Sequence, residues 1–175
     1  HAPDMYMDKI AVGSKAKGKV RLDMSIEEII KNLSVALNKN ISDITVTMLD
    51  RPRHQEMINE IRKIGARIKL FRDGDVAAAI ATCFDNSGVD LLLGTGGAPE
   101  GVIAAAALKC LGGDFQGRLH PMTKEEEKRC IEMGCGDVNK IMTMEDLVKG
   151  NEVVFAATGI TNGELLKGVV YYENN

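Results

Sequence analysis

Aromatic residues are scarce in this chain of 175 residues: tryptophan is absent, and Phe and Tyr together make up only 4% of it. Proteins that bind single-stranded nucleic acid stack bases on aromatic side chains, and few are available here. An excess of positive charge is also missing, because 22 Lys and Arg residues face 25 Asp and Glu residues. A basic surface, the usual mark of a nucleic-acid binder, is not expected. We therefore predict no nucleic-acid partner.

Long apolar runs are absent as well. No run approaches the roughly 18 residues that a membrane-spanning helix needs. The chain does not open with the pattern of a signal peptide. We therefore expect a cytoplasmic protein with no membrane partner.

Cysteine and histidine are too few and too scattered for a zinc site. The four cysteines, Cys83, Cys110, Cys130 and Cys135, form no Cys-x-x-Cys pair, and the chain has three histidines. Neither a zinc centre nor a disulfide framework is expected from this pattern. The prediction is a set of reduced, mostly buried thiols.

Helical and strand patterns alternate along the chain. Ser25 and Glu28 have the spacing of a capping box ahead of a helix, and Gly65 is placed to end another. The patterns predict helices over 26–37, 52–64, 75–83, 99–111, 124–133 and 145–149, one helical turn over 164–167, and strands over 44–49, 66–71, 89–93, 153–157 and 169–172. This order predicts an α/β fold with a mixed or parallel sheet flanked by helices.

Four predicted strands end in residues that suit ligand binding, at 50–54, 72–75, 94–100 and 157–159. In such sheets ligands bind beyond the carboxyl ends of the strands. If the strands are neighbours, these segments converge on one rim of the sheet.

Two of these segments carry charged residues. Arg51 and Arg53 could clamp an anion through paired hydrogen bonds, or they could be solvated side chains at a helix start. Asp73 and Asp75 flank Gly74 and could bind a metal ion or sugar hydroxyl groups. The alternative for them is a turn with a helix N-cap at Asp75.

The glycine-rich segment 94–97 would let backbone N–H groups approach an anion at a helix N-terminus. Pro99 stands where a dinucleotide-binding fingerprint has its third glycine, so that motif is excluded. Glu100 could stabilise the helix or offer one carboxylate to a divalent cation. Tyr6 could pack or hydrogen-bond a ligand, and nothing in the pattern positions His54 as a base.

Six phrases together resemble one family across essentially the whole chain, in order. They are Ala-Pro-Asp-Met-Tyr-Met-Asp-Lys at 2–9, Arg-Pro-Arg-His at 51–54, Asp-Gly-Asp-Val-Ala at 73–77, Gly-Thr-Gly-Gly-Ala-Pro-Glu-Gly at 94–101, Gly-Gly-Asp-Phe-Gln-Gly-Arg-Leu at 112–119 and Phe-Ala-Ala-Thr-Gly-Ile-Thr at 155–161. In combination they are similar to the class II fructose-1,6-bisphosphatases of the GlpX type.

The resemblance implies a layered α-β-α-β-α sugar-phosphatase fold. It also implies hydrolysis of fructose 1,6-bisphosphate with Mn²⁺ or Mg²⁺, in gluconeogenesis and glycerol metabolism. Arg51 stands where the family often has Lys. By matching motifs, the substrate would be bound by Tyr6, Arg51, Arg53, Asp73, Asp75 and Gly97, and the metal by Glu100.

The chain departs from the family's superfamily pattern because it contains no Asp-Pro dipeptide, and its first residue is His1. The resemblance implies that the metal motif and the water-activating residues lie in an N-terminal part. We expect residues 1–175 to be a single, substrate-binding C-terminal domain of a longer phosphatase, inactive alone and part of a homo-oligomer. The alternatives are a sugar-phosphate-binding module without turnover, a sedoheptulose-1,7-bisphosphatase, or a fragment that self-associates.

Overall fold

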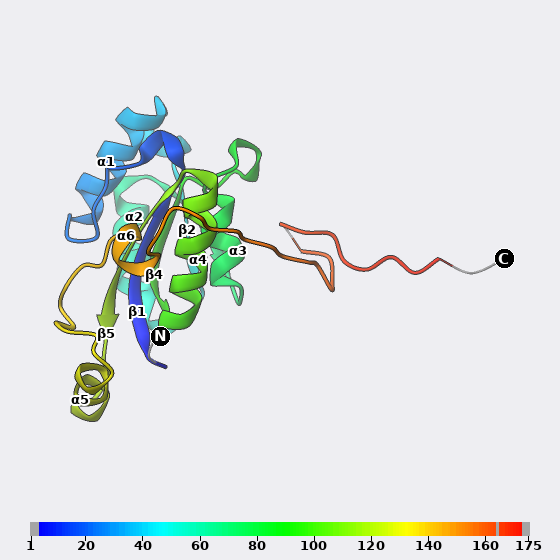
Figure 1. The fold of residues 1–175 in the computed structure, drawn as a ribbon. Coiled ribbons are helices and arrows are strands. Elements are labelled where there is room, and N and C mark those ends of the chain that lie inside the picture. Colours follow the sequence, from blue (N-terminus) through cyan, green and yellow to red (C-terminus); the bar gives the residue numbers. More distant parts are fainter. Residues whose placement is uncertain (1–3, 164, 173–175) are drawn as a thin grey trace.

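The computed structural model describes residues 4–163 and 165–172 and contains one mixed sheet with helices on both faces (Figure 1). The strands are β1 (Tyr6–Val12), β2 (Thr45–Leu49), β3 (Arg67–Phe71), β4 (Leu91–Gly97) and β5 (Asp114–His120). The helices are α1 (Ile26–Leu37), α2 (Gln55–Ile64), α3 (Asp75–Ala81), α4 (Ala98–Leu111), α5 (Lys124–Glu132) and α6 (Met144–Leu147), with short 3-10 helices at Ser14–Ala16, Ile41–Asp43, Pro52–His54 and Asp85–Ser87.

The strand order β3-β2-β4-β1-β5 puts the first strand of the chain inside the sheet. Strands β2, β3 and β4 run parallel, whereas β1 is antiparallel to both of its neighbours. Tyr6, at the start of β1, therefore pairs with Gly97 at the end of β4 and with His120 at the end of β5. The start of β1 thus lies at the edge where β2, β3, β4 and β5 end.

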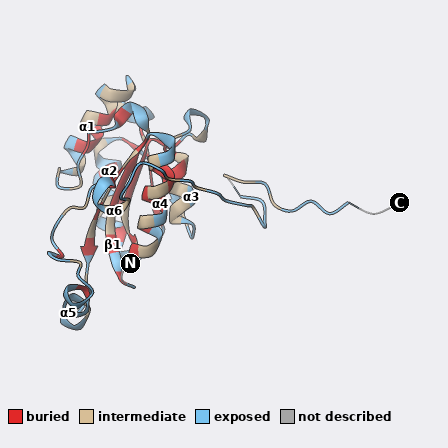
Figure 2. Ribbon diagram, viewed as in Figure 1, coloured by how far each residue is buried: buried red, intermediate tan, exposed pale blue. Residues whose placement is uncertain are grey.

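Two apolar clusters sandwich the sheet. Alternate residues of β4 belong to opposite clusters: Leu91 and Leu93 pack with α1 and α2, while Leu92 packs with α3 and α4. Figure 2 shows the buried residues along the strands and on the inner sides of these helices. Burial on both faces explains why β4 opens with an unbroken apolar run. The predicted α/β class and mixed, helix-flanked sheet are confirmed, and the described residues form three layers.

Local signals place the start of α1 and the end of α2 where the sequence predicts them. Ser25 accepts a hydrogen bond from the Glu28 N–H, and the Glu28 carboxylate accepts one from the Ser25 N–H, which is a complete capping box. Gly65 ends α2 with φ of 98°, a left-handed conformation that glycine adopts at little cost. Helix α4 lies close over β1, because a Cβ on Gly101 would come within 2.7 Å of Met7 Sδ. A small residue is needed at that crossing.

The sequence patterns did not predict two of the strands, and they predicted a loop where β4 ends. The polar opening segment is β1, and 114–120 is β5, in which Phe115, Gly117 and Leu119 are buried in alternation. The expected glycine loop 94–97 is instead the end of β4, because it pairs along its length with β1. Backbone pairing with a distant strand overrides the loop-forming tendency of the glycines.

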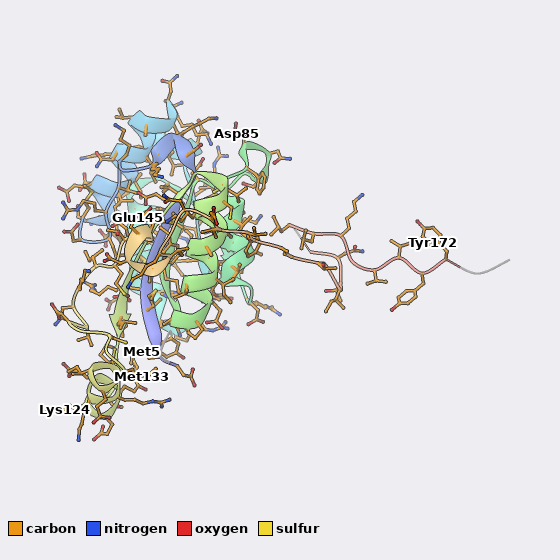
Figure 3. All side chains as sticks on the ribbon, viewed as in Figure 1. Met5, Asp85, Lys124, Met133, Glu145 and Tyr172 are labelled. Carbon is orange, nitrogen blue, oxygen red and sulfur yellow. The ribbon has the colours of Figure 1, made fainter. Side chains whose placement is uncertain are left out.

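The predictions for the C-terminal segment are wrong within the described residues. Residues 153–157 and 169–172 form no strand, residues 165–167 form no helical turn, and Glu164 lies outside the described part. The segment runs away from the sheet (Figure 1). It turns back on itself once, where the Val169 N–H donates to the Ile160 carbonyl oxygen at 3.1 Å, and then runs on to Tyr172 (Figure 3). Val154, Tyr171 and Tyr172 are each more than four-fifths exposed. A strand pattern needs a partner strand to become a strand, and this segment lies beside none in the described structure.

The prediction of mostly buried thiols is also wrong. Cys130 is buried, Cys83 and Cys135 are half-buried, and Cys110 is exposed, all four as free thiols. None of the described helices is both long and apolar enough to cross a lipid bilayer.

Candidate functional site

A cavity of about 320 Å³ opens at the edge where β2, β3 and β4 end. That volume falls at the lower end of the range found for small-molecule sites. The cavity is lined by Tyr6, Leu49, Arg51, Arg53, Asp73, Gly74, Asp75, Val76, Gly96, Gly97 and Glu100. All seven residues proposed from the sequence to bind substrate or metal therefore line the same cavity. The predicted convergence holds for three of the four strand ends, and residues 157–159 do not line it.

Arg51 connects the ends of β2 and β3. Its guanidinium donates to the carbonyl oxygens of Asp50 and Arg72, each at 2.9 Å, and lies 3.4 Å from Asp73 Oδ1. The Asp73 side chain is 92% exposed, so solvent screens this ion pair and it adds little to stability. The two backbone contacts hold the Arg51 guanidinium at the cavity wall.

Arg53 is held by β4 and by an aromatic ring. Its Nε and one terminal nitrogen donate to the Thr95 carbonyl oxygen at 3.2 Å and 2.6 Å. The guanidinium lies over the Tyr6 ring, with Cζ 4.7 Å from the ring centroid, an arrangement that attracts a cation. The remaining N–H groups of Arg53 are available to an anion in the cavity.

Asp75 does not cap helix α3. Gly74 occupies the N-cap position, and no side chain there caps the helix. The Asp75 carboxylate instead accepts a hydrogen bond from Lys9 Nζ at 2.8 Å, in an ion pair whose side chains are 13% and 3% exposed. A Cβ on Gly96 would overlap Asp75 Oδ2. Because Gly96 has no side chain, β4 leaves the space that the Asp75 carboxylate occupies.

Glu100 folds back over the first turn of α4. A Cβ on Gly97, the N-cap residue, would overlap Glu100 Oε2. Negative charge at a helix N-terminus is favourable, because the backbone N–H groups there carry partial positive charge. The helix end that the sequence suggested for an anion is thus already faced by a carboxylate of the protein.

His54 holds β2 and β4 together. It is buried, its Nε2 accepts a hydrogen bond from the Thr95 N–H at 2.9 Å, and its Nδ1 donates to the Leu49 carbonyl oxygen at 2.7 Å. Both ring nitrogens are occupied by backbone groups. His54 is therefore a structural residue beside the cavity.

A polar cluster around Asp8, missed by the sequence analysis, adjoins Tyr6 and Arg53. Asp8 accepts hydrogen bonds from Thr95 Oγ1 at 2.7 Å and from Arg118 at 3.1 Å, and His120 Nδ1 lies 3.2 Å away. Burial alone would raise the pKa of Asp8, but hydrogen bonds from Thr95, Arg118 and His120 outweigh it and hold the pKa below its ordinary value. The cluster forms because β1 pairs with β4 on one side and with β5 on the other, and this pairing was not predicted.

The described residues do not make a complete metal centre. No group of three or more His, Cys, Asp or Glu side chains among them is placed to hold a metal ion. Mg²⁺ and related hard cations need several oxygen ligands at once. Glu100 could supply one ligand, whereas the Asp75 carboxylate is already paired with Lys9.

The mixed sheet and the cavity at its carboxyl edge define an α/β protein with a cavity of small-molecule size lined by arginines and carboxylates. The profile of the family described as "Bacterial fructose-1,6-bisphosphatase, glpX-encoded" matches residues 1–175. The chain belongs to this family, as the resemblance implied.

Curated relatives carry names of the same family. The chain is 46% identical to the D-fructose 1,6-bisphosphatase class 2/sedoheptulose 1,7-bisphosphatase of Synechococcus sp. (strain JA-2-3B'a(2-13)), over 98% of this chain and 53% of that protein. It is 46% identical to the fructose-1,6-bisphosphatase class 2 of Haemophilus influenzae (strain ATCC 51907 / DSM 11121 / KW20 / Rd), over 96% of this chain and 54% of that protein. The chain thus spans about half the length of the curated relatives it matches.

Proposed function

We propose that the protein carrying this chain hydrolyses fructose 1,6-bisphosphate to fructose 6-phosphate and phosphate, and that this chain binds the sugar bisphosphate. The observation that carries the proposal is the grouping of two arginines, two aspartates, a tyrosine and a glycine strand end around one cavity. Arginine suits phosphate because its N–H groups match pairs of phosphate oxygens. Carboxylates suit sugar hydroxyl groups because they only accept hydrogen bonds.

Each side chain has a proposed part. Arg51 and Arg53 would anchor the phosphate that is not cleaved and so orient the sugar. Asp73 and Asp75 would accept hydrogen bonds from sugar hydroxyl groups, and Tyr6 would close the wall beside Arg53. Gly97 would let the ligand approach the backbone.

The cofactor we propose is Mn²⁺ or Mg²⁺, with Glu100 as one of its ligands. The remaining acidic ligands and the water-activating residues would come from an N-terminal part of the longer protein. On this proposal residues 1–175 are the substrate-binding domain of a cytoplasmic, oligomeric phosphatase, and this chain alone binds without turnover.

The exposed C-terminal segment supports a docking role toward that N-terminal part. Residues 153–157 and 169–172 have strand-type sequences, and Val154 and Tyr171 are about nine-tenths exposed. Apolar side chains of this kind gain free energy when a partner sheet covers them. Hydrogen exchange at 153–163 and 165–172 should therefore be slow in the full-length protein and fast in this chain alone. Equal exchange in both would contradict docking.

Two measurements test the function. Calorimetry on the 175-residue chain should detect binding of fructose 6-phosphate, and Arg53→Ala should weaken it while Arg62→Ala, on the exposed side of α2, should not. Phosphate release from fructose 1,6-bisphosphate with Mn²⁺ should appear in the full-length protein and be absent in this chain. Failure of the full-length protein to release phosphate would overturn the proposal.

Sedoheptulose 1,7-bisphosphate is the second candidate substrate, because the Synechococcus relative carries both activities in its name. The two sugars present the same phosphate chemistry and differ in length. The ratio of kcat/KM for the two substrates, measured on one preparation of the full-length protein, decides between them.

A further inference from the structure

We propose that Lys9 is a positioning residue for substrate recognition, acting through Asp75. The inference rests on the proposed function, since it assumes that Asp75 accepts a hydrogen bond from the sugar. Lys9 fixes one oxygen of the Asp75 carboxylate, so that the group presents a single orientation to the ligand. Its side chain does not line the substrate cavity, so it acts from behind Asp75.

The position of Lys9 is unusual for a charged residue. It lies in β1, and its neighbours on the same face, Met7 and Ala11, belong to the apolar cluster under α3 and α4. The lysine is 2% exposed as a whole residue. Burial of an ammonium group is costly unless a counter-charge meets it. Asp75, at the first position of α3, meets it at 2.8 Å.

Stability alone does not account for this pair. Replacing a buried ion pair by apolar side chains of similar size is often neutral or stabilising. An apolar residue at position 9 would continue the pattern of Met7 and Ala11. A charge at this point is better explained by its effect on the carboxylate at the cavity.

The surrounding backbone is shaped to fit the pair. A Cβ on Gly96 would overlap the Asp75 carboxylate and lie 3.1 Å from Lys9 Nζ, and a Cβ on Gly101 would lie 3.3 Å from Lys9 Cε. Glycines of β4 and α4 therefore leave space for the lysine chain and its contact. This close packing restricts the carboxylate to the observed orientation.

The pair also sets the charge that a phosphorylated ligand meets. Asp73, Asp75 and Glu100 bring three carboxylates to the cavity against Arg51 and Arg53. Lys9 neutralises one of these carboxylates from behind. Without Lys9, Asp75 would lose the contact that fixes one of its oxygens, and its charge would oppose the phosphates of the ligand. The substrate class that this arrangement favours is a phosphate ester with a hydroxyl group held between Asp75 and the arginines.

The test is a double-mutant cycle in the full-length protein with Lys9→Met, Asp75→Asn and the double variant. The double variant removes both charges together and keeps the side-chain volumes, so it guards against misfolding from an unpaired carboxylate. Binding of fructose 6-phosphate is measured by calorimetry, KM and kcat by phosphate release, and folding by Tm. Lys63→Met, on the exposed face of α2, is the control.

If Lys9 acts through Asp75, Lys9→Met weakens fructose 6-phosphate binding by about tenfold and raises KM more than it lowers kcat. The double variant then binds as Asp75→Asn does, to within about twofold. A lowered Tm with unchanged affinity and KM would show a merely structural role and overturn the proposal. Absence of binding and turnover in the wild type would instead overturn the proposed function.

Discussion

The Arg53 guanidinium lies over the ring of Tyr6, with Cζ 4.7 Å from the ring centroid, at the edge of the sheet where the parallel strands end. The two residues are far apart in the chain and meet because β1 pairs with β4. The Thr95 carbonyl oxygen accepts two hydrogen bonds from the same guanidinium. Ring and carbonyl together orient Arg53 before any ligand arrives.

Shortening Arg53 should therefore impair binding more than turnover. In the full-length protein, Arg53→Ala should raise KM for fructose 1,6-bisphosphate by about tenfold or more, as expected for a lost charge-assisted hydrogen bond. Arg53→Lys should recover only part of this, because an ammonium group lacks the fork of N–H donors. Arg62→Ala is the control in steady-state kinetics. A large fall in kcat with unchanged KM would contradict an anchoring role.

Glu100 should have opposite effects on phosphate and on metal. Its carboxylate faces the N-terminus of α4 beside Gly97, so Glu100→Gln should tighten binding of inorganic phosphate when divalent cations are removed by chelation. With Mn²⁺ present, the same variant should show weaker metal affinity and slower turnover. Calorimetry with and without Mn²⁺ measures both, with Glu125→Gln on α5 as the control. If the activity of Glu100→Gln depends on Mn²⁺ concentration as that of the wild type does, Glu100 is not a metal ligand.

Asp8 should stabilise the fold at neutral pH and lose that effect in acid. Its folded-state pKa is lowered, so its contribution is present above the ordinary value of 3.8 and disappears as the pH falls through the folded-state pKa. Asp8→Asn should cost about 1 kcal/mol near pH 7, since solvent partly screens the cluster.

Urea unfolding at several pH values checks this prediction. The difference between Asp8→Asn and wild type should shrink as the pH falls below 3.8. Glu60→Gln, an exposed change on α2, should show no such convergence. A difference that stays constant from pH 7 to acid would mean that the charge of Asp8 does not contribute.

The four thiols should differ in reactivity. Burial, followed by a hydrogen bond with Cys135, raises the pKa of Cys130 to about 12, and burial also raises the pKa of Cys83. The thiolate is the reactive form, so a disulfide reagent at pH 8 should label exposed Cys110 first and Cys130 only on unfolding. Mass spectrometry of labelled peptides measures the order, and Cys110→Ser should remove the fast phase. Fast labelling of Cys130 in the folded protein would contradict its burial.

The helices were predictable because their signals are local. The Ser25 and Glu28 pair and the left-handed Gly65 act over one turn of chain, and α1 and α2 begin or end there. The strand β1 was not predictable in the same way, because Asp8 and Lys9 interrupt its apolar pattern. Both charges are satisfied by residues more than sixty positions away, and a local pattern cannot contain such partners.

For the C-terminal segment the prediction failed in the opposite way, because strands were predicted that do not form. Its Val and Tyr residues have high strand propensity, yet residues 153–157 and 169–172 form no strand in the described structure. Propensity for a strand reflects packing against neighbouring strands more than an intrinsic preference of the backbone. A sequence can therefore indicate a strand without indicating whether its partner lies in the same chain.

The amino-acid sequence by itself determined which chemical groups line the cavity. Local signals indicate the ends of the elements that carry them, and the groups come from Arg51, Arg53, Asp73, Asp75 and Glu100. The tertiary structure alone decided how those groups are held. Insertion of β1 antiparallel between β4 and β5 places Tyr6 under Arg53, Lys9 behind Asp75 and Asp8 beside Thr95. These contacts depend on backbone hydrogen bonds between strands distant in the chain, and such pairing is chosen by the burial of both faces of the whole sheet.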